Sequence, residues 1–225
     1  MQIRRETLGA QVYDLLRDRI LRGEIAGGAR LVQGPLSEEI GISRIPIRDA
    51  LRRLESDGLV TGDEIGRYTV VPFELGDAHE IYAIRRRLEP LAVEAAAKAM
   101  TPETLADIRS LHEELTRAVR RRQLDRYLDL NFKFHMSIYE ASGMRRLVRI
   151  IRGLWQGVPP LTPVVVEGRL RRSQKEHAEI LKFLAAGDAA GAAESLDKHI
   201  ENAAAELIAS IASTRGAKKG ARTKS

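Results

Sequence analysis

The stretch that decides the fold of the N-terminal part is PLSEEIGISRIPIRDALRRLESDGLV, residues 35–60. It predicts two short helices separated by Gly41, the first of them ending at that glycine. The second begins after Ser43, a suitable N-cap, and has Pro46 in its first turn, where a missing N–H costs nothing. Gly58 closes it. Two helices joined by a tight turn are typical of a helix-turn-helix.

The second of these helices has an arginine face. Arg44, Arg48 and Arg52 recur every fourth residue, and residues 44–53 carry a local charge of +3 within a segment, residues 1–75, that nets −1. In a helix-turn-helix such a helix enters the major groove, where arginine pairs with guanine or clamps phosphate. From the spacing alone, a solvated arginine face making surface ion pairs is an equal alternative.

The residues around this stretch complete a small winged module. Apolar residues at helical spacing from Leu8 to Ile20 predict a first helix. After the second helix, two runs rich in β-branched and aromatic residues, 59–61 and 68–71, flank a turn that contains glycine and aspartate. They predict a β-hairpin, the usual wing of this fold.

From residue 75 onward the pattern is helical almost throughout. Start and stop signals predict about six helices, near residues 77–100, 102–121, 125–142, 145–155, 167–186 and 189–213. The predicted fold class is therefore mainly α. It comprises a winged helix-turn-helix over residues 1–74, an all-helical bundle over 75–213, and a basic tail over 214–225 that we expect to be disordered.

The composition excludes several classes of protein. The 225 residues contain no cysteine, which excludes disulfide scaffolds, thiolate metal sites and cysteine nucleophiles. No apolar run approaches the roughly 18 residues of a membrane span, and the charged start lacks the apolar core of a signal peptide. We therefore expect a cytoplasmic protein with no membrane partner. Most of the net charge of +6 lies on the tail, which we expect to attract phosphate.

Three histidines lie on three different predicted helices of the second part. His135, His177 and His199 are these residues, and Asn131 lies one helical turn before His135. Together they make a plausible divalent metal site inside a bundle, because imidazole suits zinc, nickel and manganese among other ions. Taken alone, scattered histidines that serve as surface or core residues are the more common alternative.

Residues 35–60 closely resemble the winged helix-turn-helix of GntR-superfamily transcription regulators. The resemblance implies that Ser43, Arg44 and Arg48 contact operator DNA and that Gly66 lies at the wing tip, which reaches into the minor groove. Arg52 is assigned to the same surface, with a phosphate contact and a solvated role both left open. Two residues depart from the family pattern: Ile45 stands where threonine is common, and Gly34 where some relatives carry a DNA-contacting arginine.

Nearly all of residues 77–202 resembles the FCD effector domain of the FadR subfamily. The matching motifs are IYAIRRRLEPLAVEAAA at 81–97, YLDLNFKFHMSIYEASG at 127–143, EHAEIL at 176–181 and KHI at 198–200. The resemblance implies one divalent cation of zinc, nickel or manganese type, held by Asn131, His135, His177 and His199. It also implies that Arg85 pairs with a small carboxylate effector, while Arg86 serves structural salt bridges. His79 and His112 match no ligand position and are expected at the surface. For Tyr139 and Trp155 we favour core packing over lining the cavity.

These expectations describe a ligand-responsive transcription regulator, a repressor that binds a near-palindromic operator as a homodimer. A small organic acid bound at the metal would control its affinity for double-stranded DNA. One alternative is a metal-dependent enzyme, because three histidines with an open coordination position also make a catalytic zinc site. Another is a structural DNA binder whose effector pocket no longer functions. Nothing in the sequence identifies a general base, so we do not expect an enzyme.

Overall fold

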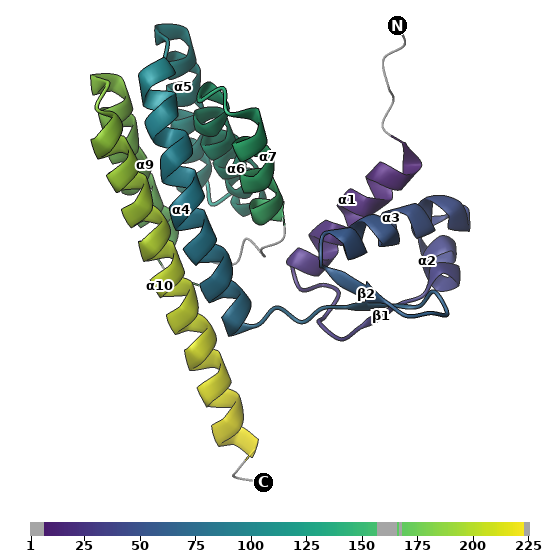
Figure 1. Cartoon of the computed structure of the whole chain (residues 1–225). Helices are drawn as coiled ribbons and strands as arrows, with labels where there is room; N and C mark the ends of the chain where they lie inside the picture. Colours follow the sequence, from purple (N-terminus) through teal and green to yellow (C-terminus); the bar gives the residue numbers. More distant parts are fainter. Residues whose placement is uncertain (1–6, 157–165, 167, 223–225) are drawn as a thin grey trace, which may run out of the picture. The chain divides into compact units, whose positions relative to one another are not determined.

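The structure is a computed structural model that describes residues 7–156, 166 and 168–222, with side chains described as far as residue 210 (Figure 1). The segment GVPPLTP, residues 157–163 between the fourth and fifth predicted helices, and the last three residues of the tail lie outside the described residues. The chain divides into two compact units, which meet in sequence between Glu74 and Leu75.

The N-terminal unit is a winged helix-turn-helix, which confirms the predicted fold. Its elements are α1 (Leu8–Leu21), β1 (Arg30–Leu31), α2 (Gln33–Ile40), α3 (Arg44–Ser56), β2 (Val60–Gly62) and β3 (Tyr68–Val70). The strands form an antiparallel sheet in the order β1-β3-β2. The hairpin of β2 and β3 was predicted. Strand β1 was not, because two residues that pair with Thr69 and Tyr68 are too short to show an alternating pattern.

The core of this unit fixes the orientation of α3. Ile47, Leu51 and Leu54 are fully buried on one side of the helix, which leaves the opposite side to solvent. Tyr13 of α1 is also fully buried; its hydroxyl donates to Asp57, and the guanidinium of Arg53 lies 3.8 Å from the ring centroid. Arg53 therefore supports the packing of α1 on α3 through a cation–π contact.

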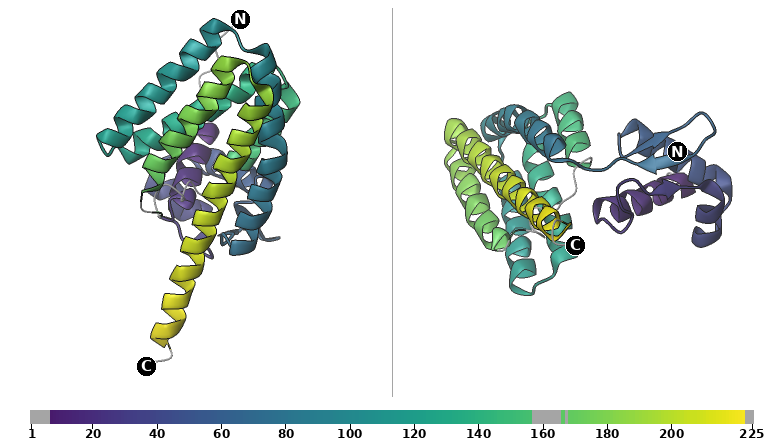
Figure 2. Two further views of the ribbon diagram at one scale, coloured as in Figure 1. Left: turned by 90° about the vertical axis from the view of Figure 1, so that its left-hand side faces the viewer. Right: turned by 90° about the horizontal axis from the view of Figure 1, so that it is seen from below.

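The second unit is a helical bundle, again as predicted. Its helices are α4 (Leu75–Ala99), α5 (Pro102–Arg120), α6 (Leu124–Ala141), α7 (Arg145–Gln156), α9 (Arg169–Ala186) and α10 (Ala189–Arg222). Helix α10 packs along α4 and α9, and α6 packs against both α4 and α5 (Figures 1 and 2). Of the helices that the structure describes, none has the length and apolar character needed to span a bilayer.

The C-terminal end differs from the prediction. A helix ending near Ser213 and a disordered tail over 214–225 were expected, whereas α10 continues to Arg222. Alanine, lysine and arginine in this stretch are good helix formers, and Gly216 and Gly220 each cost only about 1 kcal/mol within a helix. The basic composition of residues 214–225 was therefore not sufficient to predict where the helix ends.

Candidate functional site

Helix α3 presents the predicted DNA-contacting residues to solvent. Ser43, Arg44, Arg48 and Arg52 are all exposed. Ser43 is the N-cap by position, as predicted, but its side chain makes no capping hydrogen bond. A Cβ added at Gly34 would lie 3.5 Å from an Arg44 terminal nitrogen, so Arg44 extends over the start of α2, where the glycine leaves room for it.

The wing tip is a turn organised by Asp63. Its carboxylate accepts hydrogen bonds from the backbone N–H groups of Ile65 and Arg67 and from Arg67 Nε at 2.7 Å. The backbone hydrogen bond from Arg67 is the main reason why the pKa of Asp63 is lowered. Gly66 has a φ of +75°, a conformation that favours glycine. Gln33 Nε2 of α2 donates to the Gly66 carbonyl at 3.4 Å, which ties the tip to α2.

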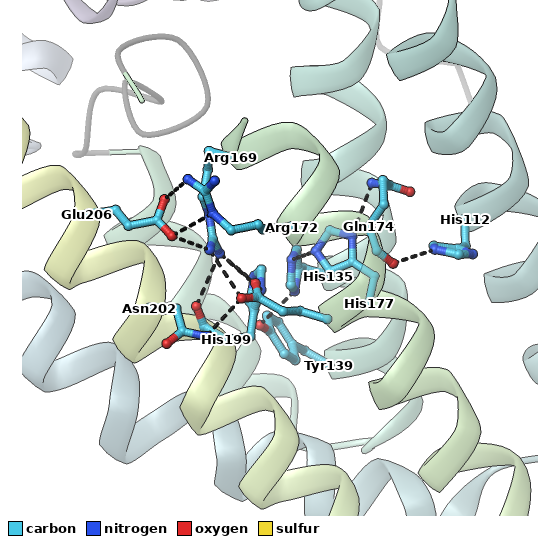
Figure 3. A network of polar contacts seen from close by, with 11 residues as sticks. His112, His135, Tyr139, Arg169, Arg172, Gln174, His177, His199, Asn202 and Glu206 are labelled. Carbon is cyan, nitrogen blue, oxygen red and sulfur yellow. Dashed lines mark hydrogen bonds and ion pairs between the residues drawn. The ribbon is translucent and has the colours of Figure 1, made fainter. Parts of the chain in front are cut away.

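The three predicted histidines meet inside the helical bundle (Figure 3). His135 of α6, His177 of α9 and His199 of α10 are buried, and one ring nitrogen from each lies within 4.8 Å of the others. The Nε2 atoms of His135 and His177 are 3.2 Å apart. Two nitrogens that bind one zinc ion at about 2.0–2.1 Å are themselves roughly 3.0–3.4 Å apart. This separation fits a shared cation, and it also suits a hydrogen bond between two imidazoles.

A second layer of polar groups orients two of these rings. The carboxylate of Glu176 lies 2.7 Å from His199 Nδ1, and the hydroxyl of Tyr139 lies 3.2 Å from His135 Nδ1. With both Nδ1 atoms engaged, the Nε2 atoms are left to face the centre. A carboxylate behind a ligating histidine is the usual support of a metal-bound imidazole.

The electrostatics of the cluster keep the imidazoles neutral. Burial lowers the pKa of His135 and His177 well below the ordinary value, and the neighbouring His199 lowers both further. The pKa of His199 is also lowered, because burial outweighs the opposing effect of the hydrogen bond that His199 Nδ1 donates to Glu176. Only neutral imidazole offers a lone pair to a metal. The donor chemistry of this cluster therefore fits a divalent cation.

Glu176 carries the negative charge nearest to this cluster. Burial acts to raise its pKa, but the hydrogen bond to His199 and the positive charge of Arg169 lower that pKa to about 2. Arg169 is itself only 1% exposed, and its terminal nitrogens lie 2.7 Å from Glu176 and 3.4 Å from Glu206 (Figure 3). The histidine cluster is thus connected to the following turns of α10 through a buried ion-pair network.

Asn131, the fourth predicted ligand, lies one helical turn before His135 on α6. Its side chain is half-buried, and no hydrogen bond to another described residue holds its amide. The position is compatible with the role implied by the family resemblance.

Arg85 is buried near the cluster, but it already has a partner. Its Nε lies 2.6 Å from Oε1 of Glu89, whose exposure is 0%. Glu89 also accepts hydrogen bonds from the Tyr139 hydroxyl and from Trp155 Nε1, the latter at 2.8 Å. The guanidinium of Arg85 lies 4.4 Å from the Trp155 ring centroid. One carboxylate of α4 therefore gathers donors from α4, α6 and α7.

The residues of this network that were not singled out from the sequence include Glu89, Arg169 and Glu176. Two carried a local signal. Glu89 follows Arg85 by four residues, the spacing of a helical ion pair, and Glu176 directly precedes His177 in the EHAEIL motif. Arg169 has no such signal, because its partners Glu176 and Glu206 come together only through the packing of α9 against α10.

The remaining predictions for this unit have mixed outcomes. His79 is exposed, as expected, but His112 was wrongly placed at the surface. It is half-buried, with Nε2 3.3 Å from the Gln174 carbonyl and its ring 6.4 Å from that of His177. Arg86 forms salt bridges to Asp197 and Glu201, both at 2.7 Å, which confirms its structural role. Tyr139 and Trp155 pack in the interior, as favoured, and also donate to Glu89.

Comparison with known proteins identifies both units. Residues 8–64 match the family model "Bacterial regulatory proteins, gntR family", and residues 80–202 match that of the FCD domain. The transcriptional regulator McbR of Escherichia coli is 31% identical over 80% of this chain and 81% of its own. The gluconate operon transcriptional repressor of Bacillus licheniformis is 26% identical over 78% and 70%. The solved structure of E. coli McbR/YncC has a TM-score of 0.78 at 29% identity, over 90% of this chain and 98% of its own.

Proposed function

Because the chain belongs to the GntR family of bacterial regulatory proteins and carries an FCD domain, it is a transcription regulator and not an enzyme, and we propose that it is a ligand-responsive repressor. The alternative of a metal-dependent enzyme is thereby set aside. In this proposal α3 and the wing bind operator DNA, and the helical domain binds a divalent cation and a small carboxylate. The observation that carries the proposal is the cluster of three buried, neutral histidines close to two buried guanidinium groups.

The DNA-binding part of the proposal assigns distinct tasks to exposed residues. Arg44 and Arg48 face the base edges, Arg52 faces a phosphate, and Gly66 brings the wing to the minor groove. One α3 helix reads only a few base pairs. A homodimer therefore doubles the number of bases read and requires a near-palindromic operator.

The cation would be held by His135, His177, His199 and Asn131. When bound, it supplies positive charge and open coordination positions for an anionic ligand. Arg85 supplies a planar guanidinium, which can bind a carboxylate through two parallel hydrogen bonds. Since Glu89 already occupies Arg85, an incoming carboxylate must take over part of that pairing.

We expect Arg48→Ala to weaken operator binding by about 1–3 kcal/mol, or roughly 5- to 150-fold, while leaving the fold intact. The arginine is exposed, so its removal leaves no buried gap. The measurement is fluorescence anisotropy with the duplex that the full-length protein enriches from randomised DNA, together with circular dichroism. Arg117→Ala, an exposed arginine of α5, is the matched control. Equal operator affinities of the unaltered protein, Arg48→Ala and Arg117→Ala would contradict the proposal that α3 binds the operator.

Carboxylates are expected to release the operator from the metal-loaded protein through Arg85. The probes are acetate, citrate and gluconate, titrated into the protein–operator complex at constant ionic strength. Arg85→Lys keeps the charge opposite Glu89 but loses the planar fork, so we expect at least a tenfold higher carboxylate concentration for half-release. Its affinity for DNA without ligand should not change. Release by equal concentrations from both proteins would place the ligand elsewhere.

A further inference from the structure

An apolar side chain lies exposed among the arginines of α3. Ile45, in the first turn of the helix, is 62% exposed, whereas Ile47 two residues later is 0% exposed. Single exposed apolar residues are common on protein surfaces, so the exposure of Ile45 does not by itself indicate a function. Its position relative to the neighbouring arginines is informative.

The helical geometry puts Ile45 on the side of the arginines. At about 100° per residue, Arg48 lies about 40° round the helix from Arg44, and Ile45 lies about 60° beyond Arg48. The buried residues Ile47, Leu51 and Leu54 lie about 120–180° from Ile45 round the helix. A helix that presents Arg44 and Arg48 to the bases therefore presents Ile45 to them as well, and from its first turn, which enters the major groove in a helix-turn-helix.

The chemistry of Ile45 restricts what it can recognise. The side chain has no donor or acceptor, so it does not distinguish bases by hydrogen bonding. In the major groove the apolar group that a base edge offers is the 5-methyl group of thymine. An isoleucine placed against any other base edge removes water from donors and acceptors without replacing their hydrogen bonds, which is unfavourable.

We propose that Ile45 selects thymine at one position of each operator half-site through contact with its 5-methyl group. This inference rests on the proposed function, since it requires α3 to lie in the major groove. It adds a base preference that the arginines do not supply, because they pair with guanine or with phosphate. It also makes residue 45 a specificity-determining residue in its own right.

The test replaces thymine by uracil, which lacks only the 5-methyl group. The full-length protein first enriches a duplex from randomised DNA, and each thymine of a half-site is then exchanged for uracil in turn. We expect one position per half-site at which the exchange weakens binding about fourfold, as for the loss of one buried methyl group. Exchange in both half-sites should weaken it roughly 15-fold.

Two variants attribute this discrimination to its source. Ile45→Ala should bind the thymine and uracil duplexes equally, because its side chain no longer reaches the methyl group. Ile65→Ala removes a 76% exposed isoleucine from the wing and should keep the full discrimination. An enriched duplex without any methyl-sensitive thymine, or discrimination that survives in Ile45→Ala, would overturn the inference alone. Failure to enrich any duplex would overturn the proposed function, and this inference with it.

Discussion

We expect the unaltered protein to purify with about one divalent ion per chain and His135→Ala to purify with almost none. His135 and His177 present Nε2 atoms 3.2 Å apart, and His199 completes the triangle. Loss of one imidazole leaves two histidine nitrogens and the amide proposed for Asn131, and no carboxylate in this set compensates for the missing donor. Elemental mass spectrometry measures the metal, on protein purified without chelators or a metal-affinity step.

Two histidine controls make the result specific to the cluster. His79→Ala removes an exposed imidazole, and His112→Ala removes one whose ring packs beside His177. Both variants should keep the ion, because neither residue belongs to the cluster. Metal-free unaltered protein that takes up no added zinc, nickel or manganese would contradict the site. So would equal metal loss from His112→Ala, since that would place His112 among the ligands.

Glu89→Ala is expected to destabilise the helical domain by about 3–5 kcal/mol, the cost of removing one partner of a buried ion pair. The change leaves Arg85 charged and buried without its carboxylate. It also deprives the Tyr139 hydroxyl and the Trp155 indole of their shared acceptor. Urea denaturation followed by circular dichroism measures the loss of stability as a lower urea concentration at the midpoint of unfolding.

The chain offers a matched control for this effect on the same helix. Glu94 and Lys98 also form an ion pair four residues apart on α4, but their side chains are 45% and 65% exposed. Glu94→Ala should cost less than about 1 kcal/mol. The double variant Arg85→Met, Glu89→Leu should recover the part of the lost stability that is due to the unpaired charge, while Tyr139 and Trp155 still lack their acceptor. Similar losses for Glu89→Ala and Glu94→Ala would mean that burial does not set the strength of this pair.

The sequence predicted much of the fold because its signals are local. Ser43 and Gly58 mark the ends of α3, and Thr101 with Pro102 marks the start of α5. The cluster of His135, His177 and His199 was also foreseeable, since all three lie in motifs that resemble the FCD domain. In contrast, the pairing of Arg169 with Glu206 joins α9 to α10 and depends on how the two helices pack.

The same distinction explains the errors. His112 looks like a surface residue because nothing within one turn of α5 reveals His177 of α9 beside it. Strand β1 exists only because β3 lies next to it. For Arg85 the family resemblance gave the residue, but not the fact that Glu89 holds it. Sequence patterns therefore identified the three histidines and Arg85, while the residues that pair with them required the packed structure.

If Arg85 binds a carboxylate effector as proposed, the carboxylate of Glu89 acts as an internal competitor for that effector. Because Glu89 is part of the chain, it competes at a high effective concentration that does not change with dilution. The affinity measured for an external carboxylate is then its intrinsic affinity multiplied by the fraction of chains in which Arg85 is not paired with Glu89. A regulator of the proposed kind would ignore low levels of simple acids. It would respond to acids whose further groups, such as hydroxyls that bind the cation, offset the loss of the Arg85–Glu89 pair.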